Sequence, residues 1–204
     1  MTPILWSFRR CPYAIRARLA LDVAGISVEH REIVLRAKPD AFLNDNPAGT
    51  VPVLVHPDHT LIHSRDIMIW ALNQHDPEAW LDMPTSGYDL IDTIEGPFKS
   101  HLDRYKYASR HSDADPLVER DAASQIVFHI EDMLTDQGWL FGTPTLADYA
   151  ILPFIRQFAH TDVTWFNAQP WPRVQHWLQS FKESERFARV MTKHPLWQPA
   201  QQPG

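Results

Sequence analysis

The sequence predicts an α/β domain at the N-terminus followed by an all-α domain at the C-terminus. A strand–helix–strand pattern occupies the first 34 residues, a hairpin and a helix follow over residues 51–75, and only helical periodicity appears from residue 88 onward. A parallel strand–helix–strand unit followed by a hairpin builds one mixed sheet. We therefore expect a domain over residues 1–76, a linker over residues 77–87 and a helical domain over residues 88–204.

The first three elements follow from short patterns. Residues 3–8 are apolar and end at two arginines, which is typical of a short buried strand. Apolar residues recur every four positions from Ile15 to Val23, which predicts a helix over residues 12–24 with the next glycine as its C-terminal stop. Residues 27–34 then predict a second strand, parallel to the first.

A hairpin and a third helix complete the N-terminal half. Residues 36–50 are polar and interrupted by proline and glycine, so we expect a loop there. Residues 51–55 predict a strand, and residues 60–62 predict its hairpin partner after a His-Pro-Asp-His turn. Ser64 is a favoured N-cap residue and is expected to begin the third helix.

The C-terminal half shows helical patterns alone. Helices are predicted at about residues 88–109, 116–136, 145–160, 170–182 and 184–192. Thr145 and Asp148 have the spacing of a capping box, with aspartate in the glutamate position, so we assign them to stability. An aromatic group in this half is expected in the core, although it could instead line an apolar pocket. Its members are Trp165, Phe166, Trp171 and Trp177.

Composition narrows the functional classes. The chain has 204 residues, 44% of them hydrophobic, and a net charge of −6, which argues against a general nucleic-acid binder. No apolar run is long enough to span a bilayer, and the N-terminus lacks a secretory signal pattern. One cysteine permits no internal disulfide, so we expect a cytoplasmic location.

The single cysteine, Cys11, lies between the first strand and the first helix, in Arg-Arg-Cys-Pro-Tyr-Ala. A thiol at a helix start meets unpaired N–H groups and the positive end of the helix dipole, and both favour the reactive thiolate. Arg9 and Arg10 add positive charge. The alternative is that Cys11 is a small apolar filler of the core.

Four motifs, in order, carry a family resemblance. They are Cys-Pro-Tyr-Ala at residues 11–14, Asn-Pro-Ala-Gly-Thr-Val-Pro-Val-Leu at 46–54, His-Ser-Arg-Asp-Ile at 63–67 and Thr-Leu-Ala-Asp at 145–148. The set resembles the glutathione S-transferase superfamily, and its cysteine-bearing, omega-like and bacterial branch in particular. The resemblance implies a thioredoxin-like N-terminal domain, an all-helical C-terminal domain, glutathione as co-substrate and a homodimer.

The resemblance also assigns residues. Cys11 corresponds to the residue that meets the glutathione sulfur, and Val51 to the one whose backbone pairs with the cysteinyl part of the tripeptide. Pro52 is expected to be cis. Ser64 corresponds to the residue that binds the γ-glutamyl carboxylate, with help from the N–H groups at the helix start.

Two positions depart from the family pattern. His63 stands where the family usually has an acid or a glutamine, and Thr50 where many relatives have a basic or amide residue. A carboxylate attracts the ammonium group of glutathione, whereas an imidazolium repels it. We therefore expect weaker glutathione binding than in relatives, declining further in acid, unless His63 points elsewhere and another group contacts the ammonium.

The second substrate has only weak candidates. Tyr13 can contact it or simply pack, and Tyr105 and Tyr107 are weak candidates because they lie in the first long helix of the C-terminal half. For Arg16 and Arg18 we favour a solvated helix face over a role in steering anionic glutathione.

A metal site is not expected. The spacing of His56, His59 and His63 invites one, but the first two flank a turn and the third follows a strand. Eleven histidines in one chain produce such spacings by accident.

The reaction is predicted from Cys11 and Ala14. Ala14 occupies the place of a resolving cysteine, so a second glutathione has to resolve any mixed disulfide on Cys11. This favours a glutathione-dependent thiol transferase or reductase that acts on glutathionylated thiols or dehydroascorbate-type acceptors. Two alternatives stay open: conjugation of glutathione to a small electrophile, and a non-catalytic binding protein of the same fold.

Overall fold

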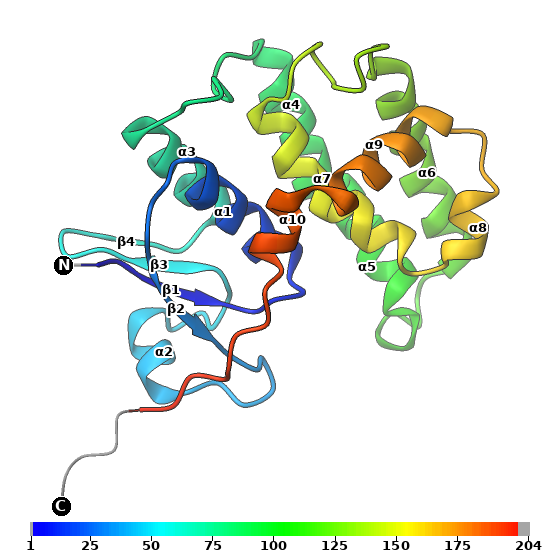
Figure 1. Cartoon of the computed structure of the whole chain (residues 1–204). Coiled ribbons are helices and arrows are strands. Elements are labelled where there is room, and N and C mark those ends of the chain that lie inside the picture. The colour runs from blue at the N-terminus through cyan, green and yellow to red at the C-terminus, as the bar shows by residue number, and fades with distance from the viewer. Residues whose placement is uncertain (1, 200–204) are drawn as a thin grey trace, which may run out of the picture. The chain divides into compact units, whose positions relative to one another are not determined.

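A computed structural model describes residues 2–199 and divides into two compact units. The divisions fall after Pro77 and after Ser184. The first unit combines the N-terminal segment with the residues that follow Ser184, and the second unit lies between them in the chain (Figure 1). This differs from the expected domain of residues 88–204, because residues from Glu185 onward pack with the N-terminal segment.

The first unit contains a four-stranded mixed sheet in the order β2–β1–β3–β4. Its strands are β1 (Ile4–Ser7), β2 (Glu29–Glu32), β3 (Val53–Val55) and β4 (Thr60–Leu61). β1 runs parallel to β2, with Ile4 opposite Glu29, and antiparallel to β3, with Ile4 opposite Val55. The predicted strand–helix–strand unit and hairpin are both present.

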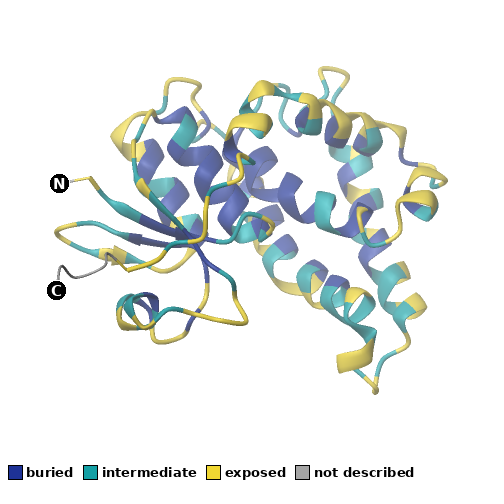
Figure 2. Cartoon of the chain, turned by 60° about the horizontal axis from the view of Figure 1, so that its bottom comes forward, coloured by how far each residue is buried: buried dark blue, intermediate teal, exposed yellow. Residues whose placement is uncertain are grey.

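Helices cover both faces of this sheet (Figure 1). They are α1 (Pro12–Val23), α2 (Asp40–Asp45), α3 (Ser64–Gln74) and α10 (Glu185–Val190). Side chains alternate along β1, so that Trp6 packs with Phe42 of α2 while the neighbouring Ser7 meets α1 on the other face. Figure 2 shows that α1 and the middle of the sheet are the most deeply buried parts of this unit.

The end of α1 has the predicted geometry. Gly25 adopts φ +68° after the helix, and its N–H donates to Asp22 O at 3.1 Å. The next N–H, of Ile26, donates to Leu21 O at 2.9 Å. These two bonds form a Schellman motif, which a glycine completes without steric cost.

The segment after α10 returns to the edge of the sheet. Leu196 forms a parallel bridge with Glu32, and Trp197 N donates to Glu32 O at 2.9 Å. The guanidinium of Arg31 lies over Trp6 at 4.9 Å and over Trp197 at 5.1 Å. The chain beyond α10 thereby covers the free edge of β2.

The second unit is helical. Its elements are α4 (Thr85–Thr93), the π-helix η1 (Ile94–Phe98), α5 (Lys99–Lys106), the 3-10 helix η2 (Ala108–Arg110), α6 (Pro116–Met133), α7 (Leu146–Ala159), α8 (Val163–Asn167) and α9 (Pro172–Glu183). Of the four aromatics predicted in the core, Phe166, Trp171 and Trp177 are buried, and Trp165 is only partly buried. Among residues 2–199, no helix is long and apolar enough to cross a membrane.

The fold class predicted from the sequence is confirmed, with three local differences. Two short helices, α2 and α8, were not expected, because five or six residues carry too little periodicity to read. The helix predicted at 88–109 begins earlier, inside the expected linker, and changes to a π-turn around Pro97. Proline lacks the N–H that a regular α-helix needs there.

Candidate active site

Cys11 is the N-cap residue of α1. Its backbone is extended (φ −71°, ψ 124°), and Pro12 follows at the first helical position. The Cys11 N–H donates to Phe8 O at 3.0 Å, and the Cys11 carbonyl accepts from Ile15 N at 2.9 Å. The half-buried thiol therefore stands at the positive end of the α1 dipole, as the sequence predicted.

The carbonyl of Val51 faces this thiol. The distance from Cys11 Sγ to Val51 O is 3.8 Å. The Val51–Pro52 peptide is cis, which confirms the isomer that the family resemblance implied. The loop before β3 thus presents the Val51 backbone to Cys11.

The turn before Val51 is held by its own side chains. Asn46 is buried, and its amide donates to Thr50 O at 2.9 Å and to Thr50 Oγ1 at 3.1 Å. Gly49 adopts φ +63° between them, a conformation that side chains disfavour. The Thr50 hydroxyl therefore serves the turn, which gives a structural reason for one of the two departures from the family pattern.

Ser64 is tied to α1 by Arg16. Arg16 Nε donates to Ser64 Oγ at 2.8 Å, and both residues are buried. The Arg16 guanidinium also lies over the Tyr13 ring, 5.1 Å from its centroid. The expectation that Arg16 and Arg18 form a solvated face is wrong, since they are 2% and 7% exposed. The two arginines stand two residues apart among apolar neighbours, and this local pattern does not show that their partners lie on other elements.

The start of α3 also differs by one residue. His63, not Ser64, is its N-cap, and Ser64 is the first helical residue. His63 is exposed, with extended backbone (φ −110°, ψ 131°). The Ser64 hydroxyl and the N–H groups at this helix start still lie together, which suits a carboxylate.

The three tyrosine candidates belong to different units. Tyr13 lies in the first turn of α1, while Tyr105 in α5 and Tyr107 at its C-terminal end lie in the second unit. Burial raises the pKa of Tyr105, whose ring packs 6.1 Å from that of Phe158. A joint pocket for a second substrate stays a prediction.

The histidine pattern adopts no metal-binding arrangement. The rings of His56 and His59 stack with their centroids 4.8 Å apart. Within the described residues, no group of three or more His, Cys, Asp or Glu side chains is arranged to hold a metal ion.

Each of the two units contains a match to a known family of domains. Residues 5–79 match the glutathione S-transferase N-terminal domain, and residues 118–180 match the glutathione S-transferase C-terminal domain. The chain belongs to the glutathione S-transferase superfamily. The N-terminal match contains Cys11, Val51, Pro52, His63 and Ser64.

Several glutathione transferases are similar in sequence. Glutathione S-transferase omega-1 of Rattus norvegicus is 26% identical over 186 residues, which are 88% of this chain and 76% of that protein. The omega-1 protein of Sus scrofa is 28% identical over 75% of this chain and 66% of its own length. A probable glutathione transferase of Aplysia californica is 50% identical over 48 residues, 24% of this chain and 52% of that protein.

Solved structures of glutathione transferases share the fold. A family member from Pseudomonas fluorescens, solved with two glutathione molecules bound, has a TM-score of 0.79 at 16% identity and covers 93% of this chain and 92% of its own. Glutathione transferase Omega 2C from Trametes versicolor has a TM-score of 0.72 at 20% identity, with 92% coverage of both chains.

Proposed function

We propose that this glutathione S-transferase superfamily member catalyses glutathione-dependent thiol–disulfide exchange. The observation that carries the proposal is a thiol at the N-cap of α1, 3.8 Å from the carbonyl before a cis-proline. A thiolate is stabilised at such a helix start and is the attacking form in disulfide exchange.

The reaction has two balanced steps. In the first, the Cys11 thiolate attacks the glutathionyl sulfur of a mixed disulfide, the disulfide bond breaks, and the substrate leaves as a thiolate. In the second, the thiolate of free glutathione attacks the glutathionylated Cys11 and releases oxidised glutathione with the Cys11 thiolate. Dehydroascorbate-type acceptors would enter as a variant of this cycle.

The need for a second glutathione follows from the chain itself. The sequence contains one cysteine, and Ala14 is fully buried one helical turn after it. Cys11 therefore has no resolving thiol within the chain. This composition favours a monothiol cycle.

Glutathione is assigned to the first unit. In this proposal the Val51 backbone pairs with the cysteinyl part, and Ser64 with the α3 N–H groups receives the γ-glutamyl carboxylate. His63 faces the ammonium group. Tyr13, Tyr105 and Tyr107 are weaker candidates for contact with a disulfide or small electrophile.

Intact mass spectrometry tests this proposal. After treatment with oxidised glutathione, the wild-type chain should gain one glutathionyl group, and Cys11→Ser should gain none. Ala14→Cys should convert the adduct to an internal disulfide, because a thiol at this position can resolve it, while the matched variant Ala14→Ser should keep the adduct.

The alternative functions have distinct outcomes. If Cys11→Ser retains or increases conjugation of glutathione to an electrophile while exchange activity is absent from the wild type, the protein is a conjugating transferase. A chain that neither acquires the adduct nor binds immobilised glutathione is a non-catalytic member of the family. Either result overturns the exchange reaction.

The setting of this reaction is also proposed. Exchange of this kind consumes reduced glutathione, and a single cysteine can form no internal disulfide, so we propose the reducing cytoplasm. The family resemblance leads us to propose a homodimer with small-molecule partners.

A further inference from the structure

The backbone of Arg9, two residues before Cys11, is held by two side chains. Its carbonyl accepts a hydrogen bond from Arg18 Nη2 at 2.7 Å, and its N–H donates to Glu32 Oε1 at 2.6 Å. Both partner side chains are buried, with 7% of each residue exposed. We call Arg18, Glu32 and the Arg9 peptide the Arg9 clamp.

Arg18 also binds the last residue of β1. Its Nη1 donates to Ser7 Oγ of β1 at 2.7 Å, so the planar guanidinium spans the last residue of β1 and the loop that follows. A guanidinium offers several donors in one fixed plane, which a lysine cannot match. The clamp therefore fixes the loop that ends at the N-cap of α1.

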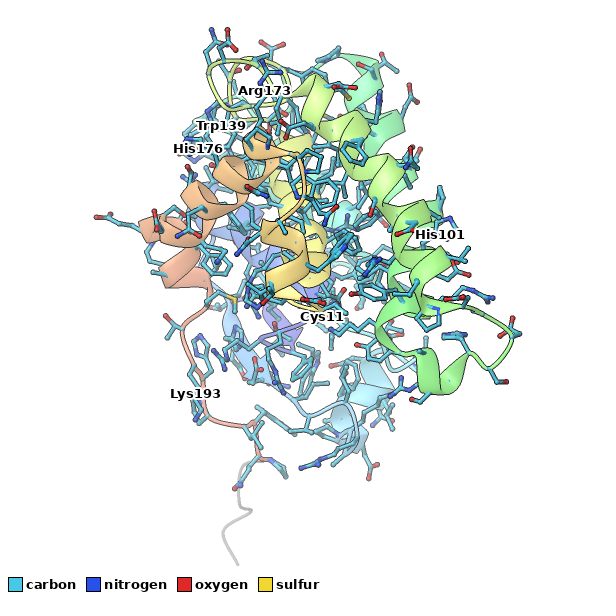
Figure 3. All side chains as sticks on the ribbon, turned by 90° about the vertical axis from the view of Figure 1, so that its right-hand side faces the viewer. Cys11, His101, Trp139, Arg173, His176 and Lys193 are labelled. Atoms are coloured by element: carbon cyan, nitrogen blue, oxygen red, sulfur yellow. The ribbon has the colours of Figure 1, made fainter. Side chains whose placement is uncertain are left out.

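The C-terminal segment packs against the clamp. Met191 Sδ lies 3.7 Å from Arg18 Nη2, and Trp197 N donates to the backbone of Glu32. The ring of His194 stacks on His30 at 3.9 Å, and His30 Nε2 lies 3.0 Å from Glu32 Oε2. Figure 3 labels Lys193 on this segment, which approaches the sheet after α10.

We propose that Arg18 is a positioning residue for Cys11, which holds the Phe8–Cys11 turn through the Arg9 peptide and favours the Cys11 thiolate with its buried positive charge. Glu32 binds the N–H of Arg9 and partly offsets that charge. This inference concerns the thiol of the proposed function and rests on it.

The charges around Arg18 support this assignment. Burial lowers the pKa of Arg18 to about 10, and attraction to Glu32 and to the Cys11 thiolate opposes the fall. The guanidinium therefore stays charged at neutral pH, and its attraction to the thiolate is mutual. The other charged or titratable groups nearby are Arg9 in the loop, His30 on β2, His194 on the C-terminal segment, and the paired Asp22 of α1 and Arg189 of α10.

The pH dependence of Cys11 alkylation by iodoacetamide tests the proposal without glutathione. Arg18→Met should move the midpoint of the profile upward by about one pH unit, because a nearby cation that favoured the thiolate is lost. Below the midpoint the thiolate fraction should fall about tenfold. A more basic thiolate is a better nucleophile, so the alkylation rate should fall by only about threefold. Arg173→Met, which removes a surface-exposed cation beside Asp136 in the second unit, is the matched control and should leave the midpoint unchanged.

Two further variants separate charge from folding. Arg18→Lys keeps the charge and should stay near the wild-type midpoint, although its stability should fall. Glu32→Gln keeps an oxygen acceptor for the Arg9 N–H but loses a negative charge, so its midpoint should move down. If the clamp were purely structural, the alkylation midpoints of Arg18→Met and Glu32→Gln would move in the same direction, or neither would move. Either outcome overturns the proposal.

Failure here can be told apart from failure of the proposed function. If the wild type acquires the glutathionyl adduct while Arg18→Met alkylates like the wild type, the clamp has no influence on the thiol and the exchange reaction stands. If alkylation responds to Arg18 as expected but no adduct forms, the clamp stands and the reaction is wrong.

Discussion

Two side chains of the proposed site lie at helix starts. Cys11 caps α1, and Ser64 begins α3 with its hydroxyl fixed by Arg16. Both side chains are short and have few rotamers, so both groups are already oriented in the absence of a ligand. Preorganised donors of this kind bind anions with little loss of conformational entropy.

His63 leads to a prediction at the same scale. Replacing His63 by Glu should tighten glutathione binding by about three- to tenfold, because a carboxylate attracts the ligand's ammonium group. Isothermal calorimetry measures the effect. His63→Gln, which gains no negative charge, should bind glutathione more weakly than His63→Glu. Equal affinities in all three proteins would show that His63 does not face the ammonium.

At the scale of the element, the capping box of α7 is a buried hydrogen-bond centre. Asp148 Oδ2 accepts from Thr145 N at 2.9 Å and from Thr145 Oγ1 at 2.8 Å, while Oδ1 accepts from Leu140 N at 3.1 Å. Burial raises the pKa of Asp148, and these donors oppose the rise. The capping box thus joins the start of α7 to the preceding loop.

This centre has a measurable contribution to stability. Asp148→Ala should lower the free energy of unfolding by about 3 kcal/mol, because it leaves the N–H groups of Leu140 and Thr145 buried without an acceptor. Thr145→Val should cost about 1 kcal/mol, since it removes the capping hydroxyl and keeps the shape of the side chain. Denaturant unfolding followed by circular dichroism gives both values, and a smaller loss for Asp148→Ala than for Thr145→Val would contradict this account.

At the scale of the whole molecule, α10 and the segment after it pack with the N-terminal segment of the chain. Asp22 of α1 binds Arg189 of α10 through two hydrogen bonds, at 3.0 and 2.9 Å, and the following segment covers the edge of β2. The first unit is therefore completed only after the second has been synthesised. Family members at 16–20% identity keep this fold, as their TM-scores of 0.72–0.79 show.

The C-terminal segment should loosen in acid. Burial lowers the pKa of His194 below its ordinary value of 6.5, and nearby His30 adds to the effect. The unfolded chain then binds a proton before the folded one does, so the stabilisation is complete above pH 6.5 and is lost as the pH falls below it. Burial acts to raise the pKa of Glu32, but its bonds to His30 and the Arg9 N–H lower it overall, which adds a further loss of stability below pH 4.5.

Amide hydrogen exchange of residues 191–199 between pH 7.5 and 5 tests this, after correction for intrinsic exchange rates. Protection should fall with pH in the wild type and should change much less in His194→Phe, which keeps a ring over His30. His160 in the second unit also has a pKa lowered by burial, so His160→Phe is the control that should leave this segment unchanged. Equal pH dependence in the wild type and His194→Phe would rule out His194 as the cause.

The sequence by itself determined what local patterns encode: the order of strands and helices, the C-terminal stop of α1, the capping box of α7 and the place of Cys11 at a helix start. Each of these depends on residues a few positions apart. The partners of Arg16 and Arg18, the role of Glu32 and the return of residues after Ser184 were decided only by the tertiary structure. Those contacts join residues far apart in the chain, and nothing in the local pattern of a charged residue specifies which distant group will be buried against it.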